Sequence, residues 1–124
     1  MVDSFRDLIV WQKSFELSLA VYRVTDSFPR DDLYGLTSQM RRSSVSIPSN
    51  IAEGRHRGGR KEFRHFLQIA FGSGAELETQ LEIAKELGRV DSDDYQKLSE
   101  LFTEVMKMLN VMIRKMSSGG STSK

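Results

Sequence analysis

The sequence predicts an all-α protein, an antiparallel up-down-up-down four-helix bundle. Apolar residues recur at spacings of three and four along four long segments, which is the period of a helix buried on one face. The chain has only two prolines and few runs of β-branched residues. Because short connections join these segments, consecutive helices are expected to be antiparallel neighbours. A chain of 124 residues forms one domain, so we expect the bundle over residues 1–116 and a disordered Ser/Gly-rich tail over residues 117–124.

The first helix is expected over residues 8–28, with Asp7 as its N-cap and Pro29 directly after its end. This helix is apolar on two faces. One stripe contains Leu8, Trp11, Phe15, Leu19 and Tyr22, and the other contains Val10, Leu17, Val21, Val24 and Phe28. Two apolar faces are more than a lone bundle needs to bury. The extra stripe indicates either a wide core-facing surface or a subunit interface, and we favour the interface.

The second helix is expected over residues 34–55. Pro48 lies inside this segment, but the apolar phase set by Leu36 and Met40 continues at Ile51. We therefore predict one kinked helix, not two separate helices.

A turn at residues 56–59 separates the second helix from the third, which is expected over residues 60–87. Gly88 follows directly and is the expected stop, because glycine readily adopts the left-handed conformation that ends helices. The fourth helix is expected to open at Asp91 or Ser92, and it keeps the strictest apolar repeat in the chain.

A stripe of polar residues runs along the second predicted helix, beside its apolar stripe. Folding the third helix back against the second places further polar residues opposite this stripe. We expect a structural polar seam made by Gln39, Arg42, Ser46, Asn50, Glu53, Ser73, Glu76 and Gln80. Within it, Ser46 should lie near Ser73, and Arg42 should form a partly buried ion pair with Glu76. Such a pair adds little net stability, so we expect it to fix register or subunit orientation.

Charge is unevenly distributed, although the net charge is only +1. The predicted topology brings the starts of helices one and three together with the ends of helices two and four. One end of the bundle should therefore be basic, with Arg55, Arg57, Arg60, Lys61, Arg64, Arg114 and Lys115. The opposite end should be acidic, with Asp26, Asp31, Asp32, Glu86, Asp91, Asp93 and Asp94.

The first five basic residues, Arg55, Arg57, Arg60, Lys61 and Arg64, are the candidate nucleic-acid-binding residues, because arginine and lysine neutralise backbone phosphates. The alternative is an ordinary solvated bundle end whose cations complement the carboxyl end of a helix. Few aromatic residues interleave with these cations, so readout of base sequence is not expected.

No residue set points to catalysis, and no catalytic residues, metal or cofactor are expected. Glu53 precedes His56, and Glu62 precedes His65, at the spacing that di-iron bundles use. The other two helices offer no carboxylates at the same height, and the neighbouring arginines would repel a metal cation. The chain has no cysteine, no signal-peptide pattern and no apolar run of about 18 residues or more. We therefore expect a cytoplasmic protein that is not an enzyme and has no membrane partner.

Several segments carry a family resemblance: FRDL at 5–8, VWQK at 10–13, GLTSQMRR at 35–42, SIPSNIAEG at 46–54 and FGSGAELETQL at 71–81. They resemble the four-helix-bundle family encoded in intervening sequences of bacterial 23S ribosomal RNA genes, also labelled S23. The resemblance covers residues 5–116, and its 47–54 run is specific. The family usually has alanine where this chain has Ser44.

The resemblance implies a ring-shaped, pentameric homo-oligomer. It also implies distant kinship with the accessory variability protein of diversity-generating retroelements, a basic ring that binds nucleic acid and a reverse transcriptase. The expected partners are further copies of this chain, the backbone of RNA or DNA, and a reverse transcriptase or other protein. The expected function is that of a non-enzymatic accessory factor that binds nucleic acid. The alternative is a structural scaffold that recruits a protein partner and has no nucleic-acid role.

Overall fold

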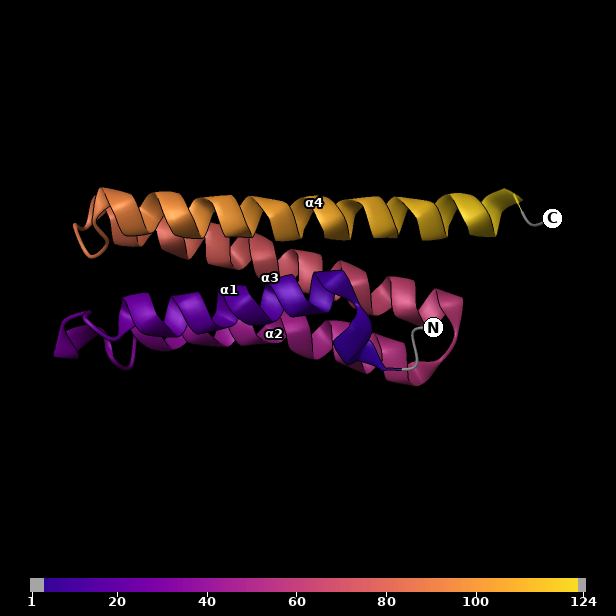
Figure 1. Ribbon diagram of the computed structural model, residues 1–124. Helices are drawn as coiled ribbons and strands as arrows, with labels where there is room; N and C mark the ends of the chain where they lie inside the picture. The colour runs from indigo at the N-terminus through magenta and orange to yellow at the C-terminus, as the bar shows by residue number, and fades with distance from the viewer. Residues whose placement is uncertain (1–3, 123–124) are drawn as a thin grey trace.

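The computed structural model describes the backbone of residues 4–122 and the side chains of residues 4–117. Every regular element in this part of the chain is helical (Figure 1). The elements are η1 (Phe5–Asp7), α1 (Ile9–Thr25), η2 (Arg30–Asp32), α2 (Leu36–Arg57), α3 (Arg60–Glu86) and α4 (Ser92–Thr122), where η denotes a single 3₁₀ turn.

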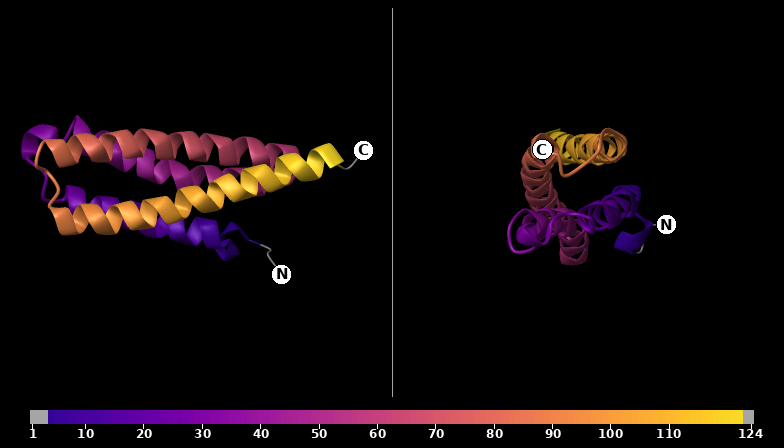
Figure 2. Two further views of the ribbon diagram at one scale, coloured as in Figure 1. Left: turned by 90° about the horizontal axis from the view of Figure 1, so that it is seen from above. Right: turned by 90° about the vertical axis from the view of Figure 1, so that its left-hand side faces the viewer.

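The four long helices form an antiparallel up-down-up-down bundle. Figure 1 shows α1 and α3 running in one direction and α2 and α4 in the other. The helices pack in chain order, and α4 returns to contact α1, so that the bundle closes (Figure 2). The starts of α1 and α3 therefore lie at the same end as the ends of α2 and α4. This arrangement confirms the predicted fold class.

Helix α1 is shorter than the sequence indicates at both ends. Ser4 caps the turn η1 by accepting the Arg6 backbone N–H, and α1 begins only at Ile9. The N-cap position belongs to Leu8, so the prediction of Asp7 as the cap was wrong. At the other end, the Phe28 N–H donates to the Thr25 carbonyl in a tight turn, which ends the helix before Pro29.

Helix α2 begins two residues later than predicted and runs without interruption through Pro48 to Arg57. The prediction of one helix, not two separate helices, is confirmed. Pro48 lacks a backbone N–H, but it is buried and contributes its ring to the packing. The helix ends at Gly58, whose φ of 86° is left-handed and therefore favours glycine at this position.

Gly88 ends α3 as predicted. Its φ is 73°, its N–H donates to the Lys85 carbonyl at 3.0 Å, and the Arg89 N–H donates to the Ala84 carbonyl at 2.9 Å. This pair of bonds is a Schellman motif, which satisfies carbonyls left free at the helix end. Asp91 then caps α4 by accepting the Asp94 N–H at 2.8 Å.

Helix α4 extends to Thr122, six residues beyond the predicted end of the bundle. The expectation of a disordered tail over residues 117–124 was therefore wrong for residues 117–122, and the remaining two residues lie outside the described chain. Extending an existing helix adds a hydrogen bond for each residue that is fixed, and it needs no new nucleus. The low helix propensity of the Ser/Gly-rich segment alone therefore did not predict where α4 ends.

The core lies between all four helices. Its most deeply buried large apolar side chains are Leu17, Val21, Met40, Ile47, Ile51, Leu67, Leu77, Val105 and Leu109. No helix in the described part of the chain is long and apolar enough to cross a membrane.

Candidate functional site

The structure brings the five candidate nucleic-acid-binding residues to one end of the bundle. Arg55 and Arg57 lie in the last turn of α2, and Arg60, Lys61 and Arg64 lie in the first turns of α3. The Gly58–Gly59 turn joins the two helices, so these residues lie at the same end of the bundle. This cluster is called the basic end below.

Arg57 and Arg60 also make contacts within the protein. The Arg57 Nε lies 2.9 Å from the Glu53 carboxylate, and its guanidinium lies 5.2 Å from the centre of the Phe66 ring. Arg60 donates to the α4 backbone, at 3.2 Å to the Lys115 carbonyl. A guanidinium has five N–H donors, so both side chains keep donors for a further ligand.

Lys61 and Arg64 differ in their exposure. Lys61 is exposed and forms no hydrogen bond or ion pair with another described residue. Arg64 is half-buried, and its Nε has no hydrogen-bond partner in the described chain. The exposed members of the basic end are therefore Arg57, Arg60 and Lys61. Arg6 in η1 lies at the same end, where its guanidinium stacks over Phe5 at 4.7 Å, and sequence reasoning missed it.

The first of the two Glu-x-x-His pairs makes contacts other than metal ligation. Glu53 contacts Arg57, and the ring centre of His56 lies 5.8 Å from that of Phe5. Among the described residues, no three His, Cys, Asp or Glu side chains gather closely enough to hold a metal ion.

Part of the polar seam forms as expected. The Ser46 and Ser73 hydroxyl oxygens lie 2.8 Å apart and join α2 to α3. The Asn50 side-chain amide donates to both the carbonyl and the hydroxyl of Ser46, at 2.8 and 2.9 Å. This half of the seam is a connected hydrogen-bond network at the helix–helix contact.

Replacing Ser46 by alanine should lower the free energy of unfolding by about 1 kcal/mol, because Ser73 and Asn50 both lose a partner. Urea denaturation followed by circular dichroism measures this change. Ser49→Ala is the matched control, since this serine is exposed on the same helix and its stability effect should stay within about 0.5 kcal/mol. Equal losses in the two variants would contradict a stabilising role for the Ser46 contact.

The other half of the seam does not form the predicted ion pair. Arg42 and Glu76 are both exposed, and the ion pairs between described side chains do not include them. The prediction was wrong because charges that remain hydrated gain little from pairing at a surface. Both residues instead line an open cleft of about 600 Å³ between the two helices. This α2–α3 cleft is lined by Tyr34, Ser38, Gln39, Arg42, Ser43, Glu76, Thr79, Gln80 and Ile83.

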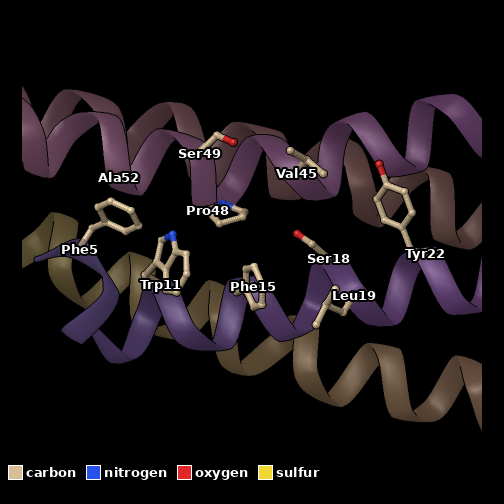
Figure 3. A pocket seen from close by; sticks show the side chains of 10 residues that line it. All are labelled: Phe5, Trp11, Phe15, Ser18, Leu19, Tyr22, Val45, Pro48, Ser49 and Ala52. Atoms are coloured by element: carbon tan, nitrogen blue, oxygen red, sulfur yellow. The ribbon is translucent and has the colours of Figure 1, made fainter.

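Three residues of the extra apolar stripe of α1 remain partly exposed. Phe15, Leu19 and Tyr22 are 45%, 40% and 43% exposed. With Trp11 they form one wall of a groove of about 490 Å³, and α2 forms the other wall (Figure 3). Phe15, Leu19 and Tyr22 therefore face the groove, while Leu8 and Trp11 of the same stripe are half-buried and pack against the core. Phe5 also lines the groove, and its ring meets the Trp11 ring edge-on with the ring centres 5.1 Å apart. Sequence reasoning gave Phe5 no such role.

A second apolar surface lies between α1 and α4. It surrounds a depression of about 520 Å³ lined by Leu8, Ile9, Val10, Lys107, Met108, Val111 and Met112. Sequence reasoning did not single out Met108 and Val111, because they fall outside the strict apolar repeat of α4. The chain thus presents two separate outward apolar surfaces.

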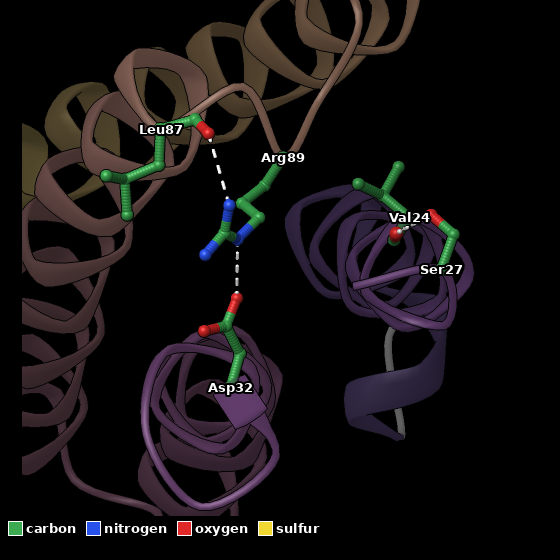
Figure 4. A network of polar contacts seen from close by, with 5 residues as sticks. All are labelled: Val24, Ser27, Asp32, Leu87 and Arg89. Carbon is green, nitrogen blue, oxygen red and sulfur yellow. Dashed lines mark hydrogen bonds and ion pairs between the residues drawn. The ribbon is translucent and has the colours of Figure 1, made fainter. Parts of the chain in front are cut away.

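At the opposite end of the bundle, one arginine connects two loops. Arg89 Nε lies 2.8 Å from the Asp32 carboxylate, and Arg89 also donates to the Leu87 carbonyl at 3.2 Å (Figure 4). These contacts connect the turn η2 to the loop between α3 and α4. Asp32 is therefore neutralised locally, and the carboxylate of Asp91 is used as a helix cap.

Comparison with known proteins gives one family and a similar solved structure. The family model described as 23S rRNA-intervening sequence protein matches residues 6–111. A crystal structure from Bacteroides thetaiotaomicron VPI-5482, described as a protein with unknown function from the S23 ribosomal protein family, is 26% identical in sequence. Its TM-score is 0.76, and the match covers 85% of this chain and 98% of that chain. The comparison with curated proteins gave no match.

Proposed function

This chain belongs to the family of 23S rRNA-intervening sequence proteins, and we propose that it is a non-enzymatic, homo-oligomeric accessory factor that binds the phosphate backbone of RNA or DNA through its basic end. One observation carries the proposal. Five cationic side chains from α2 and α3 converge at the Gly58–Gly59 turn, and three of them are exposed. Exposed arginine and lysine side chains displace counterions from a phosphate backbone, which favours binding at low salt.

The internal contacts of the basic end are compatible with this role. The Arg57–Glu53 pair is about half exposed, and exposed pairs of this kind contribute only about 0.2–1 kcal/mol. A phosphate can therefore share or replace the carboxylate at Arg57. Lys61, in the first turn of α3, is exposed and forms no pair with a described residue.

Two features support the self-association that is part of the proposal. The α1–α2 groove and the α1–α4 depression are apolar and face outward, as interaction surfaces do. When one surface of a chain binds a different surface of the next copy, the copies can join head to tail into a closed ring. A pentameric ring, as the family resemblance implies, would repeat the basic end around its axis and raise the apparent affinity through multivalency.

A salt series of RNA mobility shifts tests the nucleic-acid role. The triple variant Arg57→Ala, Arg60→Ala, Lys61→Ala should bind a single-stranded RNA more weakly, because each protomer loses three phosphate contacts. The slope of log affinity against log salt should become shallower by about 2 per engaged protomer, at about 0.7 per contact for single strands.

The matched control for this experiment removes three exposed cations from outside the basic end: Arg23→Ala, Arg30→Ala and Lys97→Ala. It has the same net charge as the test variant and should keep the wild-type affinity and slope. An equal loss in both variants would contradict a localised site. A wild-type protein that binds no polynucleotide at low salt would overturn the nucleic-acid role.

The α1–α2 groove favours the second candidate function, a scaffold that recruits a protein such as a reverse transcriptase. The groove is nearly all apolar in its lining, which suits a protein partner better than a phosphate backbone. The same mobility-shift series separates the two candidates, since an oligomeric protein that binds no polynucleotide is the result expected of a scaffold.

A further inference from the structure

The α2–α3 cleft holds two opposite charges that have no partner in the described chain. Arg42 lies on the α2 wall and Glu76 on the α3 wall, and both are exposed. The contrast with the other half of the same seam is informative, because Ser46, Ser73 and Asn50 satisfy one another there. The polar groups of the cleft thus lack the hydrogen-bond and ion-pair partners that the other half of the seam has.

An orphaned amide supports this interpretation. The Gln80 Oε1 is buried and accepts no hydrogen bond within the described chain. Gln39 and Gln80 face the same cleft from α2 and α3, and neither side chain is hydrogen-bonded to a described residue. Buried polar groups normally have partners, because desolvation without one is costly. The cleft therefore offers unused donors and acceptors in addition to its two charges.

Apolar side chains border these polar groups. Tyr34 is 94% exposed at the cleft, and Ile83 lines the opposite wall with much of its side chain exposed. The rest of the lining is polar or charged, and tyrosine and arginine are both enriched at protein interfaces, whose rims are polar. A largely exposed tyrosine also argues against a surface whose only role is hydration.

The charge pattern identifies the occupant. A polynucleotide is uniformly negative, and Glu76 would repel it. A second copy of this chain carries both an arginine and a glutamate at the same position, so it complements the cleft whichever wall it meets. We propose that the α2–α3 cleft is a subunit interface in which Arg42 of one copy pairs with Glu76 of another.

This proposal rests on the homo-oligomer proposed above and adds its contact and orientation. Arg42 and Glu76 line one cleft, so they lie at the same height along the bundle. Copies packed in parallel can therefore join the two residues without sliding along each other. Parallel packing places every basic end on the same face of the assembly. The charge pair thus selects the arrangement that gathers the phosphate-binding residues, while apolar surfaces supply affinity.

Charge reversal with light scattering tests the pairing. The single variants Arg42→Glu and Glu76→Arg should each place like charges at the contact and require about tenfold or more protein to assemble. Their mass at micromolar concentration should fall toward the 14.1 kDa protomer. The double variant Arg42→Glu, Glu76→Arg should recover the wild-type mass, because the pair is restored with its charges exchanged.

The control reverses two exposed charges outside the cleft, Glu78→Arg and Lys97→Glu, and should leave the mass unchanged. Circular dichroism verifies that every variant is helical. A wild-type protein with the protomer mass would overturn the proposed homo-oligomer together with this interface. An oligomeric wild type whose single variants keep its mass, or whose double variant does not recover it, would overturn the interface alone.

Discussion

Replacing Ile47 by alanine is expected to lower the free energy of unfolding by about 2–5 kcal/mol. Ile47 is 0% exposed and lies at the middle of α2, where the core is enclosed by helices. Removing its outer carbons takes away apolar burial and leaves a cavity that packed helices fill only in part. Small domains are stable by only about 5–15 kcal/mol, so this one change is a large fraction of the total. Urea denaturation monitored by circular dichroism measures it.

Ile69→Ala is the matched control for this measurement. Ile69 undergoes the same chemical change on α3, but it is 39% exposed, so it loses less buried area. Its variant should lose clearly less free energy of unfolding than Ile47→Ala does. Similar losses at the two positions would show that Ile47 does not have the central place in the core described above.

Replacing Gly54 by alanine should destabilise the protein by about 1–3 kcal/mol, because it overpacks the α2–α3 contact. A Cβ at this position would lie 2.7 Å from the Phe66 Cβ and 3.0 Å from the Phe63 Cδ1. The Phe66 Cβ is fixed to the backbone and cannot rotate away, so the two helices must separate. This cost exceeds the gain of about 1 kcal/mol that alanine brings over glycine inside a helix. Thermal unfolding followed at 222 nm, a standard helix signal, gives the change.

Two other glycines of the same bundle provide graded controls. A Cβ at Gly72 meets nothing within 4 Å, so Gly72→Ala should stabilise α3 by up to about 1 kcal/mol. A Cβ at Gly74 would overlap the Met106 Sδ, but a flexible methionine can move aside, so its effect should fall between the other two. The opposite order of stabilities would contradict the close approach of α2 and α3 at Gly54.

The position of Gly54 connects packing with the proposed function. It directly precedes Arg55 and packs on Phe63, which lies between Lys61 and Arg64 in the first turns of α3. The close helix contact that Gly54 permits therefore sets the spacing between the cations at the end of α2 and those at the start of α3. Separation of the helices in Gly54→Ala should weaken RNA binding in the same salt series, even though no cation is removed.

The sequence alone determined the helices and their order. Apolar spacing predicted four helices and the continuous path through Pro48, and the stop at Gly88 followed from its residue type. Asp91 and Ser92 were correctly identified as the opening of α4. These features depend on hydrogen bonds and periodicity within a few residues, which a sequence displays directly. Short connections then required antiparallel neighbours, and this requirement alone placed the cations of α2 and α3 at one end.

Only the tertiary structure decided which side chains meet across helices. It joined Ser46 to Ser73 as predicted, but it left Arg42 and Glu76 on opposite walls of an open cleft. It also turned Phe15 away from the core and into a groove that Phe5 completes. The physical reason is that such contacts depend on how each helix is rotated about its axis and how closely it packs. A small rotation changes a side-chain distance by several ångströms, while the apolar spacing in the sequence stays the same.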